Sequence, residues 1–129
     1  MITDEMKTAM QGVVPSAIVT SDPEGTPNST YISQVYFVDD THVALSHQFF
    51  NKTIRNVREN PYACVNIVSP ATFHMWKLDL KFDHSETEGD TFDQMAMQLE
   101  AIASMTGMED VFKLKGAEIF EVYATEKIT

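Results

Sequence analysis

The sequence has a single cysteine, Cys64, and therefore cannot close a disulfide bond within the chain. Cys64 lies in the apolar run YACVNIV at residues 62–68, where the expected role is that of a small buried hydrophobic side chain. The lack of a disulfide fits a reducing compartment, and we expect a cytoplasmic protein. The N-terminal residues MITDEMKTAMQG carry acids early and lack an apolar core, so no export signal is expected.

Positive charge is also scarce. Nine Lys and Arg residues oppose 19 Asp and Glu residues, which gives a formal net charge of −10 at pH 7 and a pI near 4.6. General nucleic-acid binding needs a field of Lys and Arg, so the composition argues against nucleic acid as a partner. Long apolar runs are missing as well. None approaches the ~20 residues of a membrane-spanning helix, so no membrane is expected either.

The pattern that the sequence does contain is mainly that of strands. Six segments are rich in β-branched and aromatic residues or alternate apolar with polar residues, and turns such as DPEG separate them. Strands are expected over residues 16–21, 26–40, 42–48, 62–68, 74–84 and 117–128. Capping residues and helical periodicity predict helices over residues 3–12, 51–60 and 90–107. The predicted architecture is one domain over residues 1–129, mainly β within the α+β class, as an antiparallel barrel with flanking helices.

Three of the nine basic residues lie within seven positions of the predicted helix NKTIRNVREN. Lys52 and Arg55 fall near its start, where the helix dipole is already positive, and each such placement costs about 0.3–1 kcal/mol. An anion at the helix N-terminus would offset this cost, with backbone N–H groups, the Lys52 ammonium and the Thr53 hydroxyl converging on a phosphate or carboxylate. Alternatively, these side chains extend into solvent or pair with the surplus acids. The residues alone leave both interpretations open.

Motifs of several common sites are missing. The four histidines, His42, His47, His74 and His84, show no HxH or HExxH spacing, and no cysteine pair accompanies them, so no metal site is predicted. No glycine-rich run precedes Lys52, which argues against a P-loop, and no serine lies in a G-x-S-x-G context. The sequence therefore singles out no catalytic acid, base or nucleophile.

The order of the segments resembles the pyridoxamine 5'-phosphate oxidase-like family of FMN-binding split barrels. The similar features, over roughly residues 14–123, are a D-x-x-G-x-P turn at residues 22–27, a long strand, an N-K-T-x-x-N helix start at residues 51–56 and N-P before an apolar strand. The resemblance implies a six-stranded antiparallel split β-barrel with flanking helices. It also implies a homodimer, with FMN bound in two clefts between the subunits.

The resemblance further implies roles for individual residues. Residues 52–53 would bind the FMN phosphate, residues 46–48 would line the ribityl chain and ring edge, and residues 33–35 would lie beside the isoalloxazine. Residues 76–77 lie on the strand from which the second subunit often contributes, and Arg55 could replace a basic phosphate ligand that is absent from NSTYISQ. The predicted cofactor-binding set is Ser33, Gln34, Val35, Ser46, His47, Gln48, Lys52, Thr53, Arg55, Trp76 and Lys77.

The last residues of the sequence, EVYATEKIT, lack the Arg- and Trp-containing segment with which the family's oxidase binds its substrate. Synthesis of pyridoxal phosphate is therefore not expected. The predicted function is that of an FMN-dependent oxidoreductase acting on a small molecule. The alternative is a flavin- or ligand-binding sensor or storage module without turnover.

Overall fold

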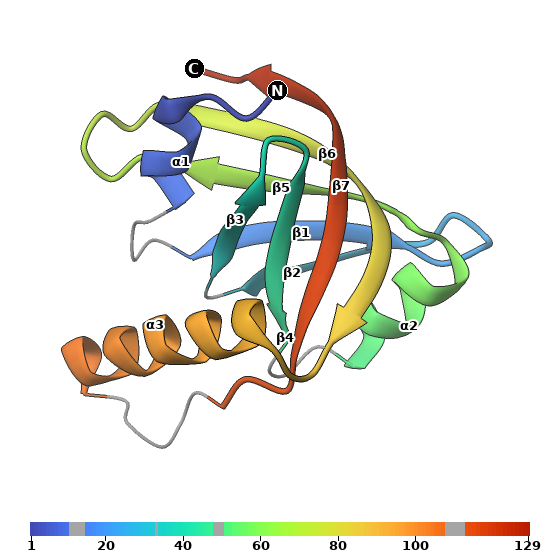
Figure 1. Ribbon diagram of the computed structural model, residues 1–129. Coiled ribbons are helices and arrows are strands. Elements are labelled where there is room, and N and C mark those ends of the chain that lie inside the picture. Colours follow the sequence, from blue (N-terminus) through green and yellow to red (C-terminus); the bar gives the residue numbers. More distant parts are fainter. Residues whose placement is uncertain (11–14, 33, 48–50, 108–112) are drawn as a thin grey trace.

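The computed structural model describes residues 1–10, 15–32, 34–47, 51–107 and 113–129, which form a mainly antiparallel sheet with three helices (Figure 1). The helices are α1 (Asp4–Met10), α2 (Asn51–Glu59) and α3 (Asp90–Thr106). The strands are β1 (Ser16–Ser21), β2 (Pro27–Ile32), β3 (Val35–Asp39), β4 (His42–His47), β5 (Tyr62–Val68), β6 (Met75–Glu86) and β7 (Gly116–Lys127). Within these ranges, no helix has both the length and the apolar character needed to cross a membrane.

The described strands form one sheet in the order β2-β1-β5-β6-β7-β4-β3, with antiparallel pairing throughout. The sheet has seven strands where six were predicted, because residues 26–40 form two strands, β2 and β3. These two lie at opposite edges of the sheet, although only residues 33 and 34 separate them in the chain. Because a chain spans at most about 3.6 Å per residue, this link keeps the end of β2 within about 11 Å of the start of β3. The sheet must therefore curl toward a barrel.

The inward and outward faces of the sheet follow the two-residue period of the strands. On β6, Leu78 and Leu80 are fully buried while Asp79 between them is partly exposed, as the alternating sequence predicts. The apolar run of β5 would suit a central strand buried on both faces, but the structure buries only one of its faces. Val65 is fully buried, but Tyr62 is 53% exposed, because Val65 faces the core inside the curled sheet and Tyr62 lies on its outer face.

The core fills the inward face of the sheet, and α1 contributes its buried side chains Met6, Ala9 and Met10 to that core. A second, smaller cluster lies on the other side of β4 and β7. There Met95 of α3 packs with Ala117 of β7, so α3 covers the outer surface of these strands. Figure 1 shows α3 crossing below the strands, with its C-terminal end extending beyond them.

The helix ends match the residues that predicted them. Thr3 precedes α1, and its hydroxyl oxygen accepts a hydrogen bond from the Met6 backbone N–H at 3.3 Å. Gly107 follows α3 in the left-handed conformation, with φ +71°, and its N–H donates back to the last turn. These local signals set the helix limits independently of the barrel.

Candidate functional site

Helix α2 turns its basic and apolar residues in opposite directions. Ile54 and Val57 are buried in the core, whereas Lys52 and Arg55 are exposed. No acidic residue lies in the first turn of α2. The positive end of the helix dipole and two cationic side chains therefore lie together at the surface, which is an arrangement that favours a bound anion.

Two side-chain amides hold α2 against the β1–β2 hairpin. Asn28 Nδ2 donates to Thr53 Oγ1 at 3.1 Å, and Asn56 Nδ2 donates to Thr20 Oγ1 at the same distance. Thr53 is only 2% exposed, so it lies at the contact between helix and sheet and not on the open surface. Its hydroxyl accepts from Asn28 and keeps its own hydrogen to donate. Sequence analysis missed Asn28 and Thr20, because 25 and 36 residues separate them from their partners.

The start of β3 lies beside the end of β4. The backbone oxygen of Gln34 accepts hydrogen bonds from Ser46, from its backbone N at 3.3 Å and from its Oγ at 3.4 Å. Gln34, Ser46 and Val35 are all buried. Gln34 Nε2 also donates to Gln98 Oε1 on α3 at 2.8 Å. Two predicted site residues, Gln34 and Ser46, are thus neighbours, and Gln98 is a contact that the sequence did not indicate.

His47 is the last residue of β4 and contacts a buried carboxylate. Its Nδ1 lies 3.2 Å from Glu118 Oε1, and Glu118, which is 2% exposed, also accepts a hydrogen bond from Ser85 Oγ through Oε2. Gly116 faces His47 across the β4–β7 ladder. A Cβ on Gly116 would lie 2.8 Å from Glu118 Oε1 and 3.6 Å from His47 Nδ1, so a glycine is required to leave room for the pair. Sequence analysis missed Glu118, because nothing local separates it from the many exposed acids.

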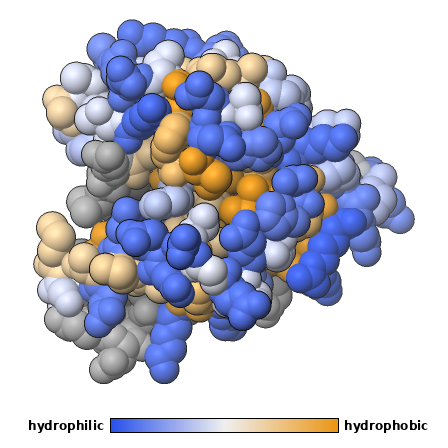
Figure 2. All heavy atoms as spheres, viewed as in Figure 1, coloured by the Kyte–Doolittle hydropathy of each residue, from blue (hydrophilic) through white to orange (hydrophobic). Residues whose placement is uncertain are grey.

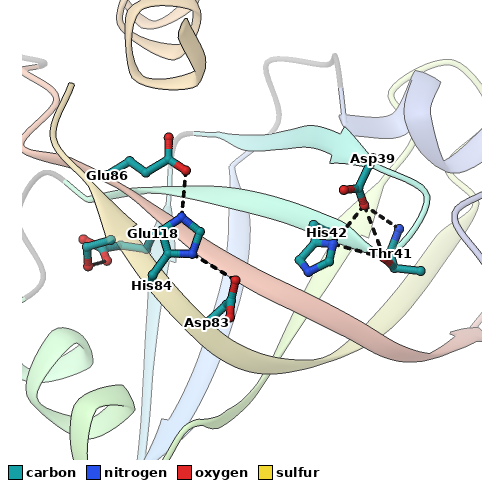
Figure 3. Close-up of polar contacts among 8 residues, drawn as sticks. Asp39, Thr41, His42, Asp83, His84, Glu86 and Glu118 are labelled. Atoms are coloured by element: carbon teal, nitrogen blue, oxygen red, sulfur yellow. Dashed lines mark hydrogen bonds and ion pairs between the residues drawn. The ribbon is translucent and has the colours of Figure 1, made fainter. Parts of the chain in front are cut away.

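A second histidine, His84, lies next to this pair on β6 but at the surface. Figure 3 shows His84 between Glu86 and Asp83, beside Glu118. Its Nε2 lies 2.8 Å from Glu86 Oε2 and its Nδ1 lies 2.9 Å from Asp83 Oδ2. The carboxylates of Glu86 and then Asp83 accept hydrogen bonds from His84 and raise its pKa above the ordinary value. The side chain of His84 is 50% exposed, so water screens these contacts far more than those of His47.

The other group in Figure 3 closes the turn between β3 and β4. Asp39 Oδ1 accepts a hydrogen bond from the Thr41 backbone N–H and lies 2.9 Å from His42 Nδ1. The Thr41 N–H, followed by His42, lowers the pKa of Asp39. These are contacts between near neighbours in the sequence, and they hold the turn.

Trp76 and Lys77 point to opposite sides of β6. Trp76 is 3% exposed and belongs to the core, whereas Lys77 Nζ lies outside, 3.5 Å from Asp79 Oδ1 and 3.7 Å from Glu126 Oε2. Asp79 in particular raises the pKa of Lys77. A molecule on the outer face would therefore meet Lys77 and not Trp76. Cys64 pairs with Asp79 across the sheet and is half-buried, and burial raises the pKa of its thiol.

Two predicted site residues, Ser33 and Gln48, lie outside the described residues. In the described part of the chain, no three His, Cys, Asp or Glu side chains are grouped in a way that could hold a metal ion.

Comparisons with known proteins identify the family and the fold of this chain. The model of the family described as pyridoxamine 5'-phosphate oxidase matches residues 2–123. No curated protein matches the sequence significantly. Among solved structures, an FMN-binding protein from Syntrophomonas wolfei subsp. wolfei superposes with a TM-score of 0.78 at 15% identity, over 97% of this chain and 83% of that one.

Two further solved structures have different descriptions. HupZ of Group A Streptococcus superposes with a TM-score of 0.73 at 20% identity, over 99% of this chain and 94% of that one. HutZ, the heme storage protein from Vibrio cholerae, superposes with a TM-score of 0.63 at 15% identity, over 98% and 94%. At such low identity these similarities establish the fold alone. They confirm the predicted split-barrel architecture.

Proposed function

The chain belongs to the pyridoxamine 5'-phosphate oxidase family, and we propose that it is an FMN-dependent oxidoreductase that acts on a small molecule as a homodimer. One observation carries the cofactor assignment: a basic helix start in a strongly acidic protein, held firmly against the sheet. The family's fold occurs in a structure described as an FMN-binding protein, which supports the choice of FMN as the anion.

The phosphate end of FMN fits the start of α2. Lys52 is exposed there and supplies the charge, and the first backbone N–H groups of the helix supply donors that lack intrahelical partners. Thr53 is buried under Asn28, so its main contribution is to fix the direction of the helix start. Arg55 is exposed one turn further on and adds a second positive charge.

The remaining predicted contacts extend from this anion site along the ends of β4 and β3. Ser46 is hydrogen-bonded to Gln34, and His47 is the next residue and the end of β4. When bound, FMN supplies electron transfer to or from the substrate. The protein's residues would hold the isoalloxazine ring and the ribityl chain in place. The buried Gln34 and Val35 exclude water, and Glu118 orients the His47 ring.

The homodimer is proposed from the outer face of the sheet. Tyr31, Tyr62 and Tyr123 are 75%, 53% and 47% exposed, and the rings of Tyr62 and Tyr123 meet edge to face at 6.1 Å between centroids. Exposed aromatic residues that gather on one face favour a protein partner. A second copy of this chain is the proposed partner, and sedimentation velocity should give a mass near twice 14.5 kDa. We expect the protein in the cytoplasm, which cell fractionation would check.

Absorption spectroscopy tests the cofactor directly. The purified protein should be yellow, or should become so with added FMN, and a nicotinamide donor with the right substrate should bleach it. A protein that takes up no FMN would refute the assignment. A yellow protein that no donor or substrate reduces would favour a sensor or storage module.

Lys52→Met tests the phosphate contact. Loss of a charge-assisted hydrogen bond at this exposed position should weaken FMN binding by about 1–2 kcal/mol, which is roughly a tenfold rise in Kd. Riboflavin, which lacks the phosphate, should bind equally to wild type and variant. Lys81→Met is the matched control on β6, and it should leave FMN affinity unchanged. An unchanged Kd for Lys52→Met would move the phosphate away from α2.

A further inference from the structure

A pocket opens between the first and third helices, on a different part of the surface from the start of α2. Its volume is about 210 Å³. It is lined by Lys7 and Met10 of α1, Val35, Tyr36 and Phe37 of β3, and Gln98 of α3. Figure 1 shows β3 lying between these two helices, and Figure 2 shows hydrophobic residues at the surface in the middle of the same view. The pocket therefore has one strand as its floor and a helix on each side.

The lining combines flat apolar surfaces with one positive charge. Tyr36 and Met10 offer aromatic and thioether contacts, which suit a planar ring, while the Phe37 ring faces Lys7. The ammonium of Lys7 lies 4.3 Å from the centre of the Phe37 ring. Its ion pair with Asp4 is long, at 3.7 Å to Oδ1, and the Asp4 side chain is fully exposed. The Phe37 ring therefore positions Lys7 at the pocket, and the ion pair with Asp4 adds little.

A buried polar atom lies beside the pocket and lacks a partner. Gln34 precedes Val35, which lines the pocket, and its Nε2 donates to Gln98, which lines it too. Gln34 is 5% exposed, and its Oε1 has no hydrogen-bond partner in the described part of the chain. Leaving a buried carbonyl oxygen unpaired is costly, so a donor brought by a ligand would be favoured at this point.

We propose that this pocket binds a small planar aromatic carboxylate that also carries an O–H or N–H donor. The ring would lie between Met10 and Tyr36, the carboxylate would pair with Lys7, and the donor would reach the Gln34–Gln98 amide pair. Because Gln34 and Val35 are also the residues assigned to the flavin ring, the pocket is the substrate site of the proposed oxidoreductase. That last step rests on the proposed function, whereas the binding itself does not.

The binding test uses the full chain without FMN and 4-hydroxybenzoate as the probe. Amide chemical shifts in ¹H–¹⁵N spectra are followed while the probe is raised to about 10 mM, which detects even weak binding. The shifts should concentrate on α1, β3 and the middle of α3, and should spare α2. Benzoate lacks the hydroxyl donor and should bind about threefold to tenfold more weakly. Absence of shifts, or shifts centred on α2, would overturn the proposal.

Two variants separate the charge from the ring. Lys7→Met should weaken 4-hydroxybenzoate about fivefold, since Lys7 is partly exposed and its pairing is screened, and should leave the uncharged 4-hydroxybenzamide unchanged. Lys81→Met is the matched control, because Lys81 also lies over an aromatic ring, Tyr62, at 5.9 Å, but outside the pocket. Equal losses in the two variants would show a nonspecific charge effect and refute the site.

A final arm repeats the titration with FMN present and records the flavin spectrum. A change in the flavin bands on addition of 4-hydroxybenzoate, lost in Lys7→Met, would support a substrate site next to the ring. Probe binding at the pocket with no FMN uptake would refute the proposed function and leave the pocket standing. FMN uptake without probe binding would refute the pocket alone.

Discussion

The buried pair of His47 and Glu118 allows a quantitative test of how this end of the barrel is held. In His47→Ala, Glu118 stays buried, and Ser85 is its remaining hydrogen-bond partner among the described residues. Removing one member of a buried ion pair costs about 3–5 kcal/mol, and orphaning a neutral acceptor costs about 1–3 kcal/mol. The His47 side chain is 17% exposed, so some water can reach Glu118 in the variant. We therefore expect a loss of about 2–3 kcal/mol in the free energy of unfolding.

Urea unfolding followed by circular dichroism measures this loss, and thermal unfolding gives an independent value. With an unfolding entropy of about 2.1 cal/mol/K per residue, a loss of this size lowers the Tm by about 7–11 °C for this chain. His84→Ala is the matched control. His84 also has two carboxylate partners, but at the surface, so its loss should cost less than about 1 kcal/mol.

Glu118→Gln provides the decisive comparison. An amide is cheaper to bury unpaired than a carboxylate, so the double variant His47→Ala/Glu118→Gln should be more stable than His47→Ala alone. Equal costs for His47→Ala and His84→Ala, or strictly additive effects in the double variant, would show that the buried pair does not stabilise the fold.

Two further changes probe the same end of the sheet. Gly116→Ala places a methyl group 2.8 Å from Glu118 Oε1, and because Glu118 is held from both sides, urea unfolding should show a loss of about 1–3 kcal/mol. The raised pKa of His84 predicts that its contacts with Glu86 stabilise the fold below the unfolded pKa of 6.5 and that this contribution is lost as the pH rises through the folded pKa. The cost of His84→Ala should therefore be measurable under mildly acidic conditions and vanish well above neutrality, and an NMR titration that finds no upward pKa shift would contradict it.

Most elements of the fold could be predicted because their signals are local. The alternation on β6, the turn before β2 and the glycine after α3 each depend on neighbours within a few residues, where sterics and burial act directly. The position of Lys52 and Arg55 at the start of α2 was predicted from local sequence in the same way. These features needed no knowledge of how the strands pair.

The errors have a common origin in long-range pairing. Residues 26–40 look like one strand, since nothing in their pattern says that the first half pairs with β1 and the second half with β4. The half-exposed face of β5 was missed because apolar residues such as Tyr62 and Cys64 can also serve the outer face of a sheet.

By itself, therefore, the sequence determined the helices, most strands, the excess of negative charge and the single basic helix start, all of which follow from residues close together in the chain. Only the tertiary structure decided which distant residues meet. The pairing of β4 with β7 brings His47 to Glu118 across 71 positions, and the packing of α3 on the sheet brings Gln98 to Gln34 across 64. Burial then gives these ordinary polar residues their importance, since a carboxylate or amide shielded from water depends on the few partners that the fold supplies.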